Sequence, residues 1–209
     1  LDRSSAASDV YKRQGKTFII SGPSGVGKST VLAALMESRP NLYFSVSATT
    51  RDPRPGEVDG VHYHFLDVDT FRQRIAADEF LEYAEYVGNF YGTPKKLVDD
   101  AMNQGKDVIL DIEIQGAIQV CSKRPDTVRI FIAPPSWAEL ERRLTERGTD
   151  PMEKIQKRLL RAKVEFQTAH TYDYFVINDT VDNAVRELNA IMTAEHCKPK
   201  ERMEIINSK

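Results

Sequence analysis

A glycine-rich turn between a predicted strand and a predicted helix constrains the fold of this chain most strongly. Residues 22–29 read GPSGVGKS and match the pattern G-x-x-x-x-G-K-[ST]; the β-rich run TFII precedes them and the helix-forming run TVLAALMES follows. The glycines let backbone amides turn toward phosphate oxygens, and the helix N-terminus adds the positive end of its dipole. The order of strand, turn and helix therefore predicts a phosphate-binding loop.

Short apolar β-rich runs alternate with segments of helical spacing along the chain. The predicted strands are 17–20, 108–110, 128–132 and 174–177, with a fifth at 43–47. The predicted helices are 28–38, 69–78, 94–104, 136–146, 151–170 and 181–195. Ser136 with Glu139, and Asp150 with Glu153, have the spacing of helix-capping pairs. Strands that are apolar on both faces indicate an α/β fold with a parallel sheet buried between helices.

The segment from about residue 50 to 93 has a different pattern, with short alternating strands predicted at 61–65 and 81–87. Gly88 and Asn89 are predicted to form the two-residue turn of a hairpin that continues at Phe90. We expect this segment to be a small mixed β insert that projects from the α/β core.

Composition excludes several classes of partner. The chain has 209 residues, of which 41% are hydrophobic, enough for one folding unit with a real core. A net charge of -2 argues against a nucleic-acid binder, and no run approaches the roughly 18 to 20 apolar residues of a membrane span. Cys121 and Cys197 have no paired spacing, which favours a reducing, cytoplasmic setting. Self-association into a homo-oligomer stays open.

The phosphate loop assigns roles to three side chains. Lys28 is expected to reach the β- and γ-phosphates of a nucleotide, and the Ser29 hydroxyl to bind Mg²⁺. Asp111 ends the apolar run before it and can bind the metal directly or through water, although a strand-end aspartate is also a common turn former. On an extended backbone Glu113 would share a face with Asp111.

The run SVSATTRDPRPGEVDGVHY at 45–63 places Arg51 and Arg54 three residues apart in a proline-punctuated loop. A guanidinium group presents a planar fork of donors that matches phosphate oxygens two at a time. The loop is therefore predicted to clamp an anion.

Six motifs occur in order: GPSGVGKST, SVSATTRDPRPGE, GNFYGT, DIEIQG, FIAPPS and ERRLTERGTD. Through these six ordered motifs the chain resembles the guanylate kinase family over about residues 16–192. The resemblance implies ATP-dependent phosphorylation of GMP to GDP, with dGMP as a second acceptor and Mg²⁺ as the required ion. The implied ATP-binding residues are Gly22, Pro23, Ser24, Gly25, Val26, Gly27, Lys28, Ser29, Thr30 and Asn178. The implied GMP-binding residues are Ser47, Arg51, Arg54, Glu57, Tyr63, Glu82, Tyr91, Gly92, Thr93 and Glu113.

The base-reading residues fit the chemistry of guanine. Guanine presents N1-H and the 2-amino group side by side, so the Glu82 carboxylate can accept both, whereas adenine has an acceptor at N1. Ser47 can donate to O6, and Glu113 can accept a further base donor. Thr93 stands where relatives can carry serine, and Glu113 stands where aspartate is common in the family. By the same resemblance the acceptor phosphate is held by Arg51, Arg54, Tyr63 and Tyr91.

The resemblance also implies a mobile helical lid over 141–158 with catalytic arginines. Arg143, Arg147 and Arg158, together with Lys28, would supply positive charge to the transferring phosphoryl group, and lid closure would exclude water. The implied organisation has a core at 15–49, 94–140 and 159–195 and a GMP-binding insert at 50–93. Residues 1–14 are expected to be a disordered or non-native extension, and 196–209 a polar tail.

Two other functions stay open on the sequence. A guanylate-kinase-like module could bind a phosphorylated peptide without catalysis, but such modules have a degraded phosphate loop and GPSGVGKS is intact. A related kinase could phosphorylate another small phosphorylated acceptor, although Ser47 and Glu82 together favour a purine base.

Overall fold

The computed structural model describes residues 14–146, 151–199 and 202–203. Its main sheet has five strands, and every neighbouring pair is parallel. The order is β2 (Leu42–Phe44), β7 (Asp107–Leu110), β1 (Thr17–Ser21), β8 (Val128–Ala133), β9 (Tyr174–Ile177). All residues of the central strands β1 and β7 are buried, as their continuous apolar runs predict.

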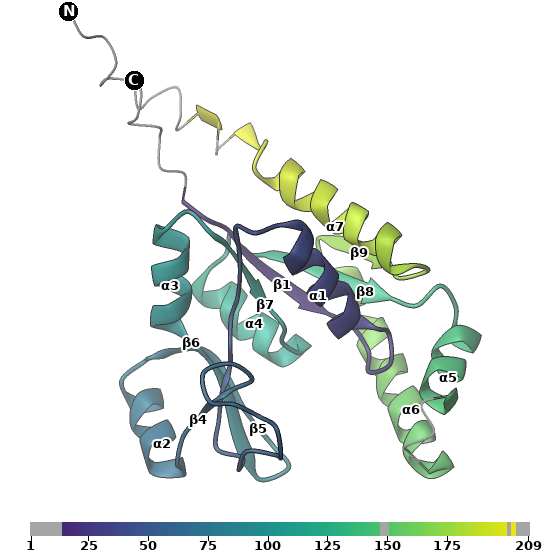
Figure 1. Ribbon diagram of the computed structural model, residues 1–209, viewed down its shortest axis with the longest axis horizontal. Coiled ribbons are helices and arrows are strands. Elements are labelled where there is room, and N and C mark those ends of the chain that lie inside the picture. The colour runs from purple at the N-terminus through teal and green to yellow at the C-terminus, as the bar shows by residue number, and fades with distance from the viewer. Residues whose placement is uncertain (1–13, 147–150, 200–201, 204–209) are drawn as a thin grey trace, which may run out of the picture.

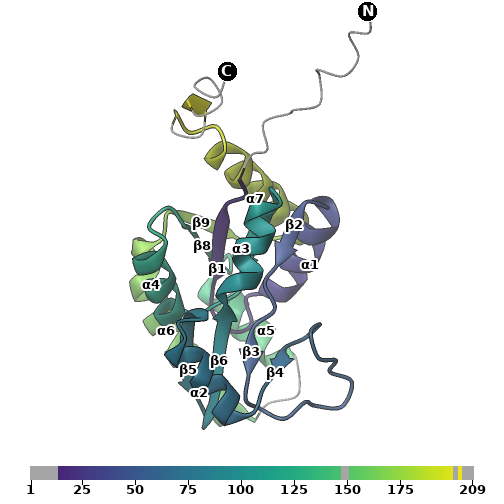
Figure 2. The ribbon, with the colours of Figure 1, turned by 90° about the vertical axis from the view of Figure 1, so that its left-hand side faces the viewer.

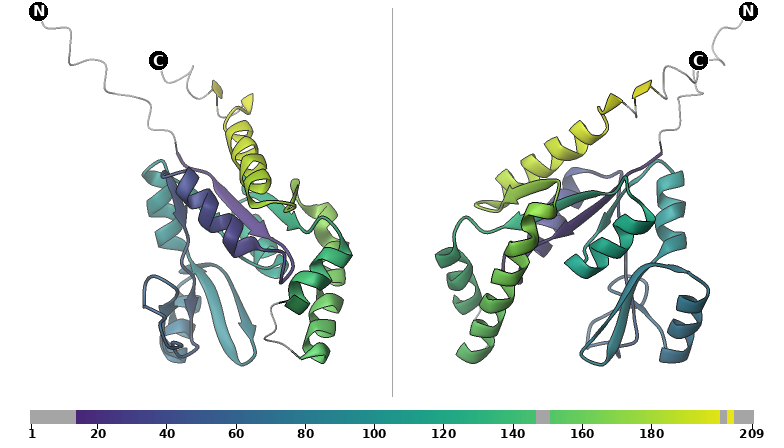
Figure 3. Two further views of the ribbon diagram at one scale, coloured as in Figure 1. Left: turned by 45° about the vertical axis from the view of Figure 1, so that its right-hand side comes forward. Right: turned by 180° about the vertical axis from the view of Figure 1, so that it is seen from behind.

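Helices cover both faces of this sheet, and strand β1 shows why. Phe18 and Ile20 point to one face, where they pack with α1 (Lys28–Ser38) and α7 (Val181–Glu195). Ile19 points to the other face, toward α3 (Lys95–Asn103) and α4 (Ile114–Lys123). Alternate side chains of a strand point to opposite faces, so this apolar strand needs helices on both sides, as Figure 3 shows.

A second, four-stranded mixed sheet lies at the end of the molecule away from α7 (Figure 2). Its order is β4 (His64–Phe65), β3 (Ala48–Thr49), β6 (Asn89–Pro94), β5 (Phe80–Tyr86). Helix α2 (Val68–Ala76) covers it, because Phe71 is fully buried and stacks on Phe80 and Phe90 with ring centroids 4.4 Å and 5.5 Å away.

Two further helices, α5 (Trp137–Glu146) and α6 (Met152–Thr168), pack on each other through Leu140, Leu144 and Ile155. A short 3-10 turn, η1 (Ala169–Thr171), leads from α6 to β9. In Figure 1 the α5 and α6 pair and the second sheet both lie below the main sheet. Within the described residues, none of the helices combines the length and the apolar character that crossing a membrane requires.

The predicted α/β class with a parallel core and a small mixed sheet is confirmed, and four details of the prediction are wrong. Helix α4 was not predicted, because Ile112 and Ile114 alternate like strand residues and Gly116 is a poor helix former. The strand predicted at 43–47 ends at Phe44, and the chain then joins the second sheet at Ala48. Of the strand predicted at 61–65, only the last two residues pair as a strand.

The fourth error concerns the hairpin turn, which lies one residue earlier than predicted. Tyr86 pairs with Asn89, so Val87 and Gly88 form the turn. Both have positive φ, 50° and 74°, as a type I′ turn requires.

The sequence predicts two capping pairs. In the first pair the N-cap hydrogen bond is observed but the reciprocal carboxylate contact is not, and the second pair lies partly outside the described residues. The Glu139 amide donates to the Ser136 hydroxyl at 3.1 Å, but the Glu139 carboxylate binds arginines of its own helix instead of the cap. Asp150, the first residue of the second pair, is outside the described residues.

Candidate active site

The phosphate loop connects β1 to α1, and neighbouring elements pack closely against its glycines. Gly27 caps α1 with φ 89°, a left-handed conformation that favours glycine. A Cβ atom at Gly25 would lie 2.6 Å from Cδ2 of Leu144, so α5 packs directly on the loop. Val26, between these glycines, is fully buried. The buried Val26 and the packing of α5 therefore anchor the loop to the core, while Ser24 stays exposed.

A cavity of about 410 Å³ opens above the phosphate loop. Lys28 and Ser29 line it from the loop, Asp111 lines it from the end of β7, and Arg158 lines it from α6. The Lys28 ammonium lies 2.6 Å from Oδ1 of Asp111. These four residues, to which the sequence assigns phosphate-binding, metal-binding and lid roles, therefore line one cavity.

The donor set in this cavity fits Mg²⁺. Ser29 and Asp111 contribute a hydroxyl and a carboxylate, the hard oxygen ligands that this ion prefers. No group of three His, Cys, Asp or Glu side chains that could hold a metal occurs in the part of the chain that the structure describes. Mg²⁺ at nucleotide sites needs only one or two carboxylates, because phosphates and waters complete its shell.

A second cavity, of about 700 Å³, adjoins the first and reaches the second sheet. Asp111 and Glu113 line both cavities, as expected for residues on one face of an extended segment. The second cavity is further lined by five predicted acceptor residues: Ser47, Tyr63, Glu82, Tyr91 and Gly92. Residues that are distant in the sequence thus surround one space.

Glu82 is buried in the wall of the second cavity, with 6% of its surface exposed. The Thr93 hydroxyl donates to Oε1 of Glu82 at 2.6 Å. Burial raises the pKa of Glu82 above its ordinary value, and the hydrogen bonds from Thr93 oppose that shift. A buried carboxylate with one oxygen bound keeps the capacity to accept further donors from a ligand.

Arg51 does not line this cavity itself but is held by Glu57 beside Tyr63, which does. Its Nη2 lies 2.9 Å from both Glu57 oxygens, and Oε2 of Glu57 also accepts the Arg54 amide at 2.7 Å. Bonding to Glu57 raises the pKa of Arg51, with a smaller contribution from Tyr91, and bonding to Arg51 lowers the pKa of Glu57. The guanidinium also lies 5.5 Å from the ring centroid of Tyr63. The Arg54 side chain is exposed and, like that of Arg51, does not line the cavity.

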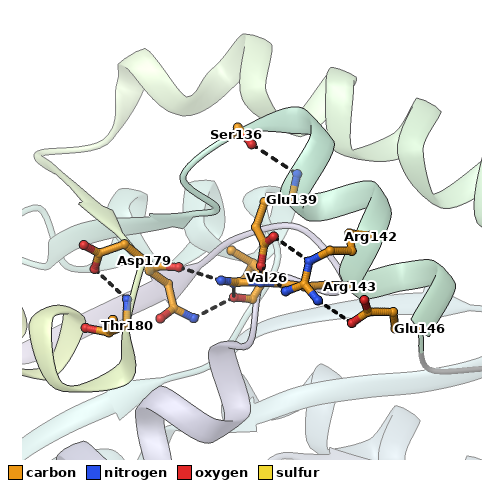
Figure 4. A network of polar contacts seen from close by, with 9 residues as sticks. Val26, Ser136, Glu139, Arg142, Arg143, Glu146, Asp179 and Thr180 are labelled. Atoms are coloured by element: carbon orange, nitrogen blue, oxygen red, sulfur yellow. Dashed lines mark hydrogen bonds and ion pairs between the residues drawn. The ribbon is translucent and has the colours of Figure 1, made fainter.

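Arg143 and Asn178 both bind the phosphate loop at Val26, and Figure 4 shows the Arg143 side chain there. The Arg143 guanidinium donates to the carbonyl oxygens of Val26 and Asn178, each at 3.0 Å. The buried Asn178 amide donates to the same Val26 carbonyl at 2.7 Å. Glu139 accepts from Nε of Arg143 at 2.7 Å. Two residues predicted to contact nucleotide therefore use their donors on backbone carbonyls in this structure.

The other two predicted lid arginines differ in what the structure shows of them. Arg158 lines the first cavity from α6. Arg147 lies outside the described residues.

Three side chains at the junction of the cavities were not predicted: Tyr86, Arg161 and Glu165. Nη2 of Arg161 lies 2.6 Å from Oε2 of Glu113, its Nε lies 3.1 Å from Glu165, and its guanidinium lies over the Tyr86 ring at 5.6 Å. Burial raises the pKa of Glu165. Arg161 and Glu165 follow Arg158 at three and seven residues, the spacing of one helix face, and that spacing is the sequence signal for them.

Comparison with known proteins agrees with this arrangement. The family model described as guanylate kinase matches residues 14–195. The chain is 54% identical over 182 residues to a guanylate kinase of Thermus thermophilus, covering 87% of this chain and 82% of that protein. It is 50% identical over 185 residues to a guanylate kinase of Clostridium perfringens, covering 88% and 86%.

A solved structure agrees as well. The crystal structure of guanylate kinase from Anaplasma phagocytophilum superimposes with a TM-score of 0.72 at 34% identity, covering 90% of this chain and 89% of that one. With the family model spanning most of the chain and relatives at half identity, this chain belongs to the guanylate kinase family.

Proposed function

We propose that this protein phosphorylates GMP, with dGMP as a second acceptor, by direct transfer of the γ-phosphoryl group of Mg-ATP. The observation that carries the proposal is the pair of adjoining cavities, one over the phosphate loop and one around Glu82, which share Asp111 and Glu113. A donor nucleotide in the first cavity and an acceptor in the second would meet at this shared wall. Membership of the guanylate kinase family supports the same reaction.

On the donor side, the amides of residues 22–30 bind the phosphates of ATP at the N-terminus of α1. Lys28 lines this cavity and supplies positive charge to the transferring group. Ser29 and Asp111 hold Mg²⁺, which neutralises charge on the phosphate oxygens when it is bound. Asn178 is assigned to the adenine end; its amide already binds Val26, so it holds the loop beside the base.

On the acceptor side, Glu82 reads guanine by accepting N1-H and the 2-amino group, while Ser47 donates to O6 and Glu113 accepts a further donor. Adenine would offer no pair of donors to this buried carboxylate, whose Oε1 alone is already bound by the Thr93 hydroxyl. Polar sites of this kind discriminate by about 10⁴ or more. The acceptor phosphate is bound by Arg51, Arg54, Tyr63 and Tyr91, and Glu57 supports this group by fixing the Arg51 fork.

The transfer itself needs positioning and positive charge rather than covalent chemistry. The attacking oxygen is already an anionic phosphate oxygen, so the reaction proceeds in line without an enzyme-bound intermediate or a strong general base. Arg158 and Arg147 are the proposed sources of charge from a closing lid. For Arg143 the structure favours a different role from the predicted catalytic one, because its fork is bound to the Val26 carbonyl of the loop and to the Asn178 carbonyl after β9. We assign it to positioning the loop.

We place the reaction in the cytoplasm. Cys121 and Cys197 are both free, which suits a reducing compartment.

A phosphotransfer assay with Mg-ATP and GMP, dGMP, AMP, CMP or UMP tests the proposal. The expected result is turnover of GMP and dGMP, with the other acceptors lower by about 10⁴. Folded protein without GMP turnover would overturn it. Phosphopeptide binding without turnover would then favour the interaction module, and turnover of a sugar phosphate alone would favour the other kinase.

A further inference from the structure

Helix α4 lies along the free edge of strand β5, the last strand in the order of the second sheet. Three residues on one face of α4, two of them through their side chains and one a glycine, meet this strand at spacings of three and four residues. The Gln119 amide donates to the Tyr83 carbonyl at 3.0 Å and accepts from the Tyr83 amide at 3.2 Å. Lys123 donates to the Phe80 carbonyl at 2.8 Å. Side chains of the helix thus hydrogen-bond to backbone groups on the edge of β5, which a further strand would otherwise pair with.

The third residue on this face, Gly116, meets Glu82. Oε1 of Glu82 accepts from Thr93, and its other oxygen, Oε2, faces Gly116. A Cβ atom at Gly116 would lie 2.8 Å from Oε2 and 3.2 Å from Cδ of Glu82. Carbon atoms essentially never approach this closely, so any larger residue would displace the carboxylate. Gly116 therefore sets the position that the Glu82 side chain can occupy.

Glycine at this point is otherwise unfavourable. Gly116 is buried inside α4, where glycine costs about 0.5–1 kcal/mol of helix stability relative to alanine. Its backbone needs no positive φ, because it lies within the helix. The close approach of Glu82 is the feature of the structure that requires glycine here.

We propose that Gly116 and Gln119 are positioning residues for guanine recognition by Glu82. Gly116 leaves the space that the carboxylate fills, and Gln119 fixes the backbone of Tyr83, the next residue along β5. This inference rests on the proposed function, in which Glu82 reads the base. Misplacement of a binding group by about 1 Å can cost about 10²-fold in rate, so a small shift of β5 or of the carboxylate should be visible in GMP kinetics.

Gly116→Ala gives a test in which helix propensity and the proposal predict opposite results. Propensity alone predicts a protein that is equally or more stable and fully active. The proposal predicts that kcat/KM for GMP falls by about tenfold or more while KM for ATP stays within about twofold. Ile118→Ala is the matched control, because Ile118 is on the same helix and 66% exposed, and it should leave both constants unchanged. Unchanged GMP kinetics in folded Gly116→Ala would overturn the proposal.

The same substitution in a Glu82→Ala background separates action through Glu82 from direct obstruction of the base. Without the carboxylate, the added methyl group has nothing to displace, so kcat/KM for GMP should fall no further than about twofold. A second loss as large as that in the Glu82-containing protein would mean that the methyl group blocks guanine itself, and would overturn the role assigned to Gly116.

Gln119→Leu keeps the proposal testable if Gly116→Ala does not fold. Gln119 reaches the Tyr83 backbone from the helix side and acts on guanine only through β5. We expect kcat/KM for GMP to fall about threefold to tenfold with KM for ATP unchanged; unchanged GMP kinetics, or equal losses for both substrates, would overturn the proposal. If the unmodified protein does not use GMP, the proposed function fails. If it does, and Glu82→Ala lowers kcat/KM for GMP to a reduced but measurable value while both positioning variants behave as the unmodified protein, only this inference fails.

Discussion

Lys28 and Asp111 form an ion pair, with the lysine Nζ 2.6 Å from Oδ1 of the aspartate. Their side chains are 21% and 32% exposed, so the pair sits in the mouth of the cavity rather than in the core. In our account both residues change partners when Mg-ATP binds: the lysine turns to phosphate oxygens and the aspartate to the metal. Before Mg-ATP binds, the ion pair neutralises both charges. A lysine and an aspartate can therefore share one site.

Arg143 is expected to act on ATP through the phosphate loop. Lysine keeps the charge but lacks the planar fork that reaches two carbonyls. Arg143→Lys should raise KM for ATP by about tenfold and leave KM for GMP within about twofold in steady-state kinetics. Arg142→Lys is the control, since Arg142 shares the partner Glu139 but its side chain is 52% exposed. Equal changes in both KM values for Arg143→Lys would contradict the role.

Glu82 is expected to lower stability at neutral pH. Burial raises its pKa above the ordinary 4.5, so the folded protein holds the proton at pH values where the unfolded chain has lost it. Stability therefore falls as pH rises between the two pKa values. Glu82→Gln should raise Tm at neutral pH, by about 2–4 °C for each kcal/mol, and the gain should shrink as the pH falls toward 4.5. A pH-independent difference in Tm would contradict this.

Thr93 is expected to orient Glu82 through its hydroxyl. Thr93→Val keeps the shape of the side chain but removes the donor 2.6 Å from Oε1. Hydrogen bonds to charged groups contribute about 1.5–3 kcal/mol, so kcat/KM for GMP should fall by about 10-fold to 100-fold. Thr93→Ser retains the donor and should stay close to the unmodified protein. The interpretation would be wrong if serine and valine had the same effect.

Val87 is expected to weaken the hairpin between β5 and β6. It has φ 50° and is 80% exposed, and a β-branched residue in this conformation is strained by about 1–3 kcal/mol. Val87→Asn gives the favoured Asn-Gly pair of a type I′ turn and should raise Tm by about 2–4 °C without changing kinetics. Val87→Ile keeps the branching and should give no gain. A lower Tm for Val87→Asn would count against strain at this turn.

Much of the core could be predicted from the sequence because its signals are local. The phosphate loop between a strand and a helix, and strands apolar on both faces such as 128–132, each depend on neighbouring residues. The second sheet was harder. Ala48 and His64 pair on neighbouring strands, but the residues that flank them in the sequence give no signal for two such short strands.

The polar partners in the site could not be predicted, because they depend on tertiary packing. The sequence marks Arg143 as one arginine among several, and only the packing of α5 on the phosphate loop brings it to the Val26 carbonyl. Likewise, the contact between Gly116 and Glu82 requires α4, a helix that the alternating pattern concealed. The family motifs therefore identify the site residues, whereas tertiary packing determines which groups those residues contact.

The proposed mechanism divides the site into a donor half and an acceptor half. Calorimetric titration of ATP and of GMP, separately, into Glu82→Gln and Lys28→Ala tests this division. We predict that Glu82→Gln raises Kd for GMP by more than about tenfold with Kd for ATP within about twofold. Lys28→Ala should keep Kd for GMP within about twofold, while kcat in the phosphotransfer assay falls by about 10² or more. Equal weakening of ATP binding by both variants would contradict the account.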